Sequence, residues 1–159
     1  MMPVFTLLEN IRSLHNVGSV FRSSDGAGVS RIFLTGYTGT PPRDQISKTA
    51  LGAELTVPWK QYKRPMNIIR RLKQQGVQIV ALETGEHAED LFRFEPHWPL
   101  CLMVGNEVEG LSTELMEAAD MTVKIPMMGT KESLNVSCAY SIAIYELLRK
   151  HQKNPFRSS

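Results

Sequence analysis

The sequence predicts an α/β domain with a mostly parallel sheet and helices on both faces. Short apolar runs alternate along the chain with segments of helical periodicity, as they do in this fold class. The apolar runs are continuous rather than alternating, which is typical of strands buried on both faces. The chain of 159 residues is long enough for one hydrophobic core. We therefore expect a single domain over residues 1–151 and a flexible C-terminal tail over residues 152–159.

The predicted strands are the apolar runs themselves, because strands of a parallel sheet are short and β-branched or aliphatic throughout. A further strand is expected near Leu55–Trp59. The five main runs are Val4–Leu8, Arg31–Leu34, Val77–Leu82, Leu100–Val104 and Met121–Ile125.

The predicted helices are marked by capping residues and by glycine stops. Asn16 is a candidate cap for the first helix, which Gly26 and Gly28 would end. Pro65 suits the start of the second helix and Gly76 its end. The third is expected to begin at Ser112 and run through Ala119. Asn135 would cap the last helix, whose apolar stripe is Val136, Ala139, Tyr140, Ala143, Ile144 and Leu147.

Composition excludes several classes of protein. No apolar run is long enough to cross a membrane, and no basic segment precedes an apolar one at the N-terminus. The two cysteines, Cys101 and Cys138, lie in segments that we expect to be buried, and their spacing fits neither a disulfide framework nor a metal site. The four histidines are scattered, so no metal is expected. A reducing, cytoplasmic location is the natural interpretation.

The net charge of +2 conceals an uneven distribution. Residues 1–76 carry about +7 and residues 77–159 about −5. This is either a chance feature of a solvated surface or a basic face for an anionic polymer beside an acidic pocket for a small ligand. The residues that would form the basic face include Arg12, Arg22, Arg43 and Lys48, followed by Lys60, Lys63, Arg64, Arg70, Arg71 and Lys73.

Two turns in the last third of the chain are the most informative motifs. The segment 105–112, with sequence GNEVEGLS, follows the run Leu100–Val104. The segment 125–137, with sequence IPMMGTKESLNVS, follows the run that begins at Met121. Both turns therefore lie at the carboxyl ends of predicted strands, where open α/β sheets bind their ligands.

A phosphate-binding loop is a poor interpretation of the first turn. Gly105 and Gly110 have the required spacing, but Leu111 stands where such a loop needs lysine. Glu107 and Glu109 would repel a phosphate. The turns suit a neutral or cationic small molecule better.

A third block, Asn16-x-Gly18-x3-Arg22, joins the first strand to the first helix. On spacing alone, Asn16 can be a simple helix cap and Arg22 a surface cation. However, the three blocks in this order resemble the sequence motifs of the SpoU/TrmH branch of the SPOUT RNA methyltransferases. The resemblance spans essentially the whole chain.

The resemblance implies a fold and an activity. The fold would be a parallel α/β sheet with a C-terminal trefoil knot, acting as a homodimer. The activity would be methyl transfer from S-adenosylmethionine to a ribose 2′-hydroxyl in tRNA or rRNA. The alternatives are a catalytically idle RNA-binding dimer of the same fold and a methyltransferase that acts on a base.

The resemblance also implies which residues bind and react. Many relatives carry an extra N-terminal RNA-binding domain that we do not see here, so we expect RNA to bind the basic surface of Arg12, Arg22, Arg43 and Lys48. The catalytic or substrate-side set would be Asn16, Arg22, Glu107, Ser133 and Asn135. The cofactor would be bound by Leu82, Glu83, Thr84, Gly105, Asn106, Ile125, Met127, Met128, Ser133 and Leu134.

Some of these roles have a structural alternative. A guanidinium stays protonated, so we expect Arg22 to hold a phosphate and acidify the hydroxyl rather than to accept its proton. Glu107 either takes part in the reaction or accepts backbone N–H groups within its loop. Ser133 and Asn135 either contact the ligands or cap the last helix. Of Met127 and Met128, we expect one to line the adenine site.

Overall fold

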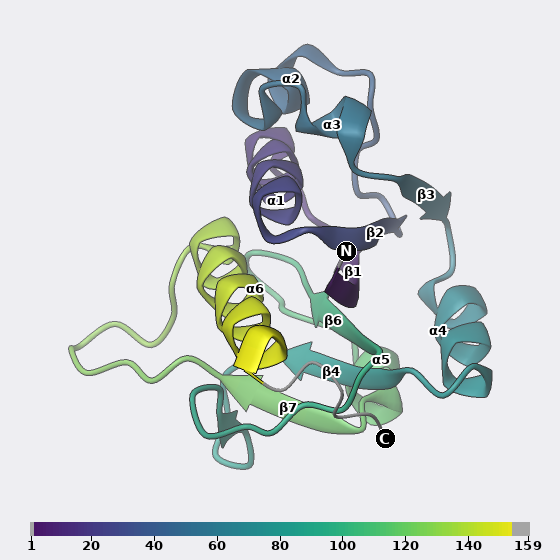
Figure 1. Ribbon diagram of the computed structural model, residues 1–159. Coiled ribbons are helices and arrows are strands. Elements are labelled where there is room, and N and C mark those ends of the chain that lie inside the picture. Colours follow the sequence, from purple (N-terminus) through teal and green to yellow (C-terminus); the bar gives the residue numbers. More distant parts are fainter. Residues whose placement is uncertain (1, 154–159) are drawn as a thin grey trace.

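The computed structural model describes residues 2–153, and these fold around one parallel sheet (Figure 1). Within them, seven strands lie in the order β3-β2-β1-β6-β4-β7-β5, and each of the six pairings is parallel. The predicted fold class is therefore confirmed. Strand order does not define a knot, and the trefoil knot stays a prediction of the resemblance. The strands are β1 (Met2–Glu9), β2 (Val29–Thr35), β3 (Trp59–Tyr62), β4 (Gln78–Leu82), β5 (Glu89–Asp90), β6 (Leu100–Val104) and β7 (Met121–Lys124).

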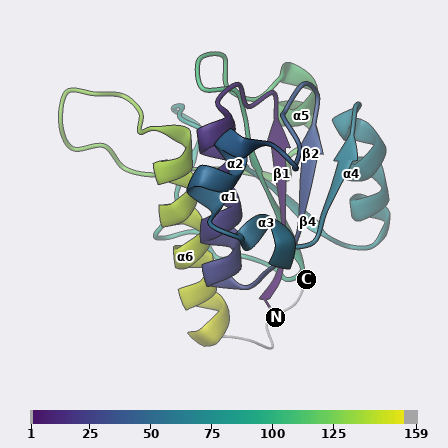
Figure 2. The same cartoon turned by 90° about the horizontal axis from the view of Figure 1, so that it is seen from above.

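Helices cover both faces of the sheet (Figure 2). One face carries α1 together with α2, α3 and α6, which pack against it. The other face carries α4 and α5. None of the helices among residues 2–153 is long and apolar enough to cross a membrane. The helices are α1 (Leu14–Ala27), α2 (Asp44–Ala50), α3 (Ala53–Thr56), α4 (Pro65–Gln74), α5 (Thr113–Ala118) and α6 (Val136–Lys153).

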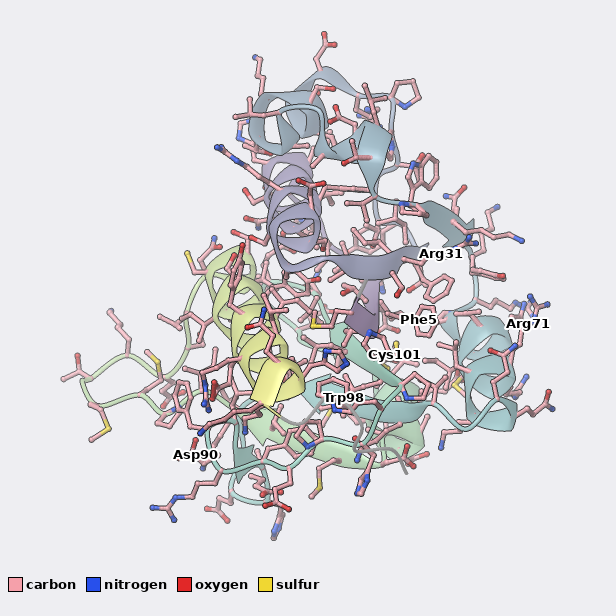
Figure 3. The ribbon with its side chains drawn as sticks, viewed as in Figure 1. Phe5, Arg31, Arg71, Asp90, Trp98 and Cys101 are labelled. Carbon is pink, nitrogen blue, oxygen red and sulfur yellow. The ribbon has the colours of Figure 1, made fainter. Side chains whose placement is uncertain are left out.

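Each face of the sheet has its own hydrophobic core. Because neighbouring side chains on a strand point to opposite faces, Leu8 packs in the core under α1 and α6, and Leu7 in the core under α4 and α5. Figure 3 shows Phe5 and Cys101 on the α4 side of the sheet and Arg71 on α4 itself. All five main apolar runs are strands, and their continuous patterning reflects this burial from both sides.

Tyr140 of α6 fixes that helix to the centre of the sheet. Its side chain is buried, and its hydroxyl lies 2.5 Å from the Thr6 hydroxyl on β1 and 2.8 Å from the Ser24 hydroxyl on α1. Burial raises the pKa of Tyr140, so the phenol stays protonated. The predicted apolar stripe of the last helix is confirmed, with Ala143, Ile144 and Leu147 buried beside Tyr140.

Four local predictions were wrong. The first helix begins at Leu14 with Ser13 as its cap, because the Ser13 hydroxyl accepts the Asn16 N–H at 3.2 Å; Asn16 lies in the first turn. Gly26 lies inside α1, and Gly28, with φ 76°, ends it. Cys138 is exposed rather than buried, since it lies outside the apolar stripe of α6. The fourth error concerns the strand expected near Leu55–Trp59, which is β3 over Trp59–Tyr62.

The segment before β3 is helical, and the sequence analysis missed it. It contains α2 and the four-residue α3, neither of which has a side-chain cap. Gly18 is buried where α2 crosses α1, and a Cβ there would lie 2.3 Å from the Ile46 carbonyl oxygen. The glycine of the first motif therefore permits close helix packing. At the other end, α6 runs to Lys153, past the boundary expected at residue 151, and residues 154–159 of the expected tail lie outside the described residues.

Candidate functional site

A pocket of about 560 Å³ lies at the carboxyl edge of the sheet. Its walls come from the ends of β4, β6 and β7 and from the first turns of α6. The long loop between β7 and α6, which projects from the body of the domain in Figure 1, forms one side. Pockets of this size and position are typical of small-molecule sites in open α/β sheets.

The structure brings the residues predicted to bind the cofactor to this one pocket, with a single exception. Met128 is 94% exposed and lies outside the pocket, while Met127 lines it. Of the two methionines, Met127 is the one placed to contact a ligand in this pocket, and a role at an adenine site stays a prediction. The other predicted residues that line the pocket are Leu82, Glu83, Thr84, Gly105, Asn106, Ile125, Ser133 and Leu134.

The pocket combines an apolar wall with acidic groups. Leu82, Ile125 and Leu134 supply much of the apolar surface. Carboxylates come from residues 83, 107, 109 and 132, and no lysine or arginine of residues 2–153 is part of the lining. This balance suits a flat apolar group joined to hydroxyls or a cation, and it disfavours phosphate-bearing cofactors.

Glu83 is the most enclosed of these acids. Burial raises its pKa, and the hydrogen bond from the Leu111 N–H at 3.3 Å offsets this only in part. As a half-buried carboxyl group in the pocket wall, Glu83 is placed to form hydrogen bonds with hydroxyl or amine groups of a ligand.

The loop after β6 is held in shape by Gly105 and Asn106. A Cβ on Gly105 would lie 2.4 Å from the Leu111 nitrogen, so the loop can close on itself only with glycine there. The side-chain oxygen of Asn106 accepts the N–H groups of Val108 and Glu109, each at 2.8 Å. Its amide nitrogen donates to the Asn10 carbonyl at 2.9 Å. Asn106 therefore contributes to the pocket by ordering the backbone of the loop that lines it.

Glu107 ties this loop to the end of β1. Its carboxylate accepts the Arg12 and Ser13 N–H groups, both at 2.9 Å, and the Asn16 amide at 3.0 Å. Partial burial acts to raise the pKa of Glu107, but these three hydrogen bonds outweigh it and the net effect lowers the pKa. Glu107 is therefore an ionised carboxylate with its oxygens occupied, which makes it a positioning group rather than a free base.

Asn16 and Asn135 extend the same network toward α6. The Asn16 side-chain oxygen lies 3.4 Å from the Asn135 amide nitrogen. The Asn135 oxygen accepts the Ser137 N–H at 2.9 Å and the Cys138 N–H at 3.3 Å, so Asn135 caps α6 as predicted. Ser133 is exposed, lines the pocket, and lies two residues before that cap. Asn16, Glu107 and Asn135 thus form one chain of polar contacts at the pocket rim.

Arg22 is not part of this constellation. It lies further along α1, where it lines a second cavity of about 610 Å³ with Lys48 of α2 and Tyr145 of α6. Arg12 is exposed beside the Glu107 loop, and Arg43 is the exposed residue just before α2. Arg70, Arg71 and Lys73 lie on α4, on the opposite face of the sheet from Lys48, so the basic residues do not form one continuous face.

Part of the pocket lining was not predicted from the sequence. Val136 and Ala139 were assigned to the buried stripe of the last helix, and they do pack on the core, but they also close the pocket. Glu132 lies in the loop before α6, where no periodic signal marks a side chain as facing inward. No group of three or more histidine, cysteine or acidic residues within residues 2–153 is placed to hold a metal ion. The remaining lining residues are Val104, Val108, Glu109 and Gly110.

Comparison with known proteins gives a consistent family. The family model described as the SpoU rRNA Methylase family matches residues 3–145. The chain is 32% identical over 148 residues to the 23S rRNA (guanosine-2′-O-)-methyltransferase RlmB of Vibrio vulnificus, which covers 93% of the chain and 60% of that protein. It is 32% identical to the tRNA (guanosine(18)-2′-O)-methyltransferase of Escherichia coli K12, over 91% of the chain and 62% of that protein. The chain thus spans about three fifths of the length of these relatives.

Solved structures agree with the fold. The TrmH/SpoU tRNA modifying enzyme of A. aeolicus superposes with a TM-score of 0.88 at 28% identity, covering 98% of this chain and 78% of that one. The SpoU methyltransferase AviRb of Streptomyces viridochromogenes, in complex with the cofactor AdoMet, has a TM-score of 0.88 at 25% identity. It covers 94% of this chain and 61% of the other.

The Glu107 network predicts a pH-dependent contribution to stability. The folded pKa of Glu107 lies below its ordinary value of 4.5, so its stabilisation is complete above that pH and is lost as the pH falls through the folded pKa. Replacing Glu107→Gln should lower the free energy of unfolding by about 1 kcal/mol near neutral pH. Urea denaturation of both proteins at several pH values measures the difference, which should vanish in acid.

The matched control is Glu109→Gln, two residues along the same loop, which should follow the wild-type pH profile. A difference between wild type and Glu107→Gln that persists unchanged in acid would show that the ionised carboxylate is not the stabilising group.

Proposed function

The chain belongs to the SpoU rRNA Methylase family, and from that premise we propose that it transfers a methyl group from S-adenosylmethionine to a ribose 2′-hydroxyl of RNA. The observation that carries the proposal is the single pocket at the sheet's carboxyl edge. The residues implied by the three sequence motifs, apart from Met128 and Arg22, gather at that pocket or at its rim.

The pocket residues fit this cofactor. Leu82, Ile125 and Leu134 offer an apolar wall for a purine, and Glu83 offers acceptors for ribose hydroxyls. Acidic residues at the pocket mouth suit a molecule that bears an amine and a sulfonium, and the lining has no cation that would call for a phosphate. When bound, S-adenosylmethionine supplies an activated methyl group.

The chain's own residues supply orientation. The amide of Asn16 is fixed by Glu107 and Asn135, which both line the pocket, so Asn16 lies beside the pocket with hydrogen-bonding capacity left over. From there it can orient a ribose hydroxyl, and much of the rate can come from holding the two reactants in line. Glu107 positions Asn16 and does not contact the substrate itself, because its carboxylate oxygens already accept hydrogen bonds from Arg12, Ser13 and Asn16.

Arg22 supplies charge. Its guanidinium stays protonated, so it is not the acceptor of the hydroxyl proton. A bidentate contact to the phosphate beside the target ribose would place a positive charge near the 2′-hydroxyl and lower the pKa of that group. The proton then passes to the phosphate or to water.

We further propose that the chain works as a homodimer in which Arg22 of a second copy approaches the pocket. In a single chain Arg22 lies outside the pocket, while the proposed reaction needs its charge at the ribose. Tyr145 of α6 lines the Arg22 cavity and is exposed, as is Ile142 one turn earlier on the same helix, and the two provide apolar surface for such a contact. A two-fold interface would complete both sites at once.

The adjacent methionines test the cofactor pocket. Replacing Met127→Ala should weaken S-adenosylmethionine binding roughly fivefold, because its side chain lines the pocket. The control Met128→Ala should leave affinity unchanged, because Met128 is 94% exposed and outside the pocket. Isothermal titration calorimetry measures both. Equal effects of the two substitutions would place the cofactor elsewhere.

The activity itself is tested with tritiated S-adenosylmethionine and unmodified bulk tRNA and rRNA. Wild type should label ribose 2′-O-methyl nucleotides, and the labelled fraction identifies whether tRNA or rRNA is the substrate. Arg22→Ala should lower the rate about a hundredfold or more with unchanged cofactor affinity. Arg22→Lys should also be impaired, since lysine cannot make a bidentate contact.

The outcomes separate the alternatives. Label on a base would identify a base methyltransferase. RNA binding without cofactor binding would identify an idle RNA-binding dimer. Nearly full activity in Arg22→Lys would contradict the bidentate contact.

Mixing two inactive variants tests delivery of Arg22 from a second copy. Leu134→Glu places a charge in the apolar wall of the pocket, and Arg22→Ala leaves the pocket intact. If sites form across the dimer, each mixed dimer has one intact site, and co-refolded protein should recover about a quarter of wild-type activity. If each chain supplies its own Arg22, the mixture stays inactive, and the proposed arrangement is wrong.

A further inference from the structure

Tyr37 is an exposed aromatic residue that is nevertheless held in place. Its side chain is 60% exposed. Its hydroxyl accepts the Asn106 amide at 2.7 Å, and its backbone N–H donates to the Asn10 side-chain oxygen at 3.0 Å. A surface tyrosine that is bonded at both ends presents its ring without a further entropic cost of ordering. A purely structural tyrosine would more often bury its ring than its hydroxyl.

The hydroxyl of Tyr37 contacts a residue that lines the pocket. Tyr37 follows the end of β2, and its hydrogen-bond partner Asn106 lines the pocket at the end of β6. Because β1 lies between these two strands, the ends of β2 and β6 are separated by two strand spacings, about 10 Å. A polymer whose reacting unit enters the pocket would place its next unit near Tyr37.

Three exposed cations lie on segments that contact the Tyr37 turn. Arg12 follows the turn that contains Asn10, whose side-chain oxygen accepts the Tyr37 N–H. The Lys63 carbonyl accepts the Gly36 N–H at 3.2 Å, which brings the Lys63–Arg64 segment next to the residue that precedes Tyr37. An exposed ring with cations nearby is the usual means of holding a single nucleic acid strand, with bases on the ring and phosphates on the cations.

We propose that Tyr37 is the stacking platform for the base of a nucleotide next to the one whose ribose is methylated, with Arg12, Lys63 and Arg64 contacting the phosphates. The proposal rests on the proposed function, since it names the form in which RNA reaches that site. The substrate would be a single-stranded segment, such as a loop, whose bases are already unstacked.

The test measures binding of a fluorescently labelled decamer of adenosines and of a decamer with the same backbone but without bases. Replacing Tyr37→Leu removes the ring and should weaken binding of the adenosine decamer roughly tenfold, with no change for the abasic decamer. The control Tyr37→Phe keeps the ring and should bind the decamer within about threefold of wild type. Fluorescence anisotropy gives the affinities, and thermal melting verifies that each variant is folded.

Several results would overturn the proposal. Equal affinity of wild type for the adenosine decamer and the abasic decamer would show that no base is stacked. Wild-type affinity of Tyr37→Leu for both decamers would show that the Tyr37 ring is not the platform. An equal loss on both decamers with a changed oligomeric state would identify Tyr37 as an interface residue. Base-dependent binding without methyl transfer in the tritium assay would support the stacking role of Tyr37 and contradict the proposed methyltransferase function. Methyl transfer with an unchanged KM for RNA in Tyr37→Leu would support that function and contradict the stacking role.

Discussion

The site depends on the bond between the Glu107 carboxylate and the N–H groups of Arg12 and Ser13. The strands β1 and β6 are neighbours, but the chain leaves β1 for α1 on one face and leaves β6 for α5 on the other. Diverging exits of this kind open a crevice at the edge of a parallel sheet. Glu107 spans the crevice and fixes its width, and Asn16 takes its place on the rim only because that width is fixed.

The same boundary divides the chain by charge. One side of the crevice is built from β3, β2 and β1, which lie within the basic first 76 residues; the other is built from β6, β4, β7 and β5, which lie within the acidic remainder. The pocket belongs to the acidic side and Tyr37 with its cations to the basic side. A cationic cofactor in the pocket would therefore contact mainly acidic surface, and an anionic polymer beside it would contact mainly basic surface.

The main strands, the last helix and the loops that line the pocket could be predicted from the sequence, because buried periodic segments and short motifs mark them. The bounds predicted for the run Leu100–Val104 are those of β6, and Asn135 caps α6 as predicted. Local sequence signals and tertiary packing agree at both places. The cap of the first helix was predicted at Asn16 instead of Ser13, because serine and asparagine both suit a cap. In the structure the Asn16 side chain donates to Glu107, a contact that the sequence does not reveal. The lining of the second cavity by Arg22, nearly two turns beyond Asn16, and the hydrogen bond between Tyr37 and Asn106 depend on contacts between distant segments that spacing does not encode.

The bond between Tyr140 and Thr6 joins residues 134 positions apart. During synthesis on the ribosome, the basic side of the sheet can assemble early, but β1 must wait with one edge unpaired until β6 has emerged. The start of α6 also supplies part of the pocket wall through Asn135, Val136 and Ala139. A nascent chain that stops short of this helix therefore has no complete cavity, so ligand capture reports that translation has passed α6 and that its contact with β1, between residues far apart in the sequence, has formed.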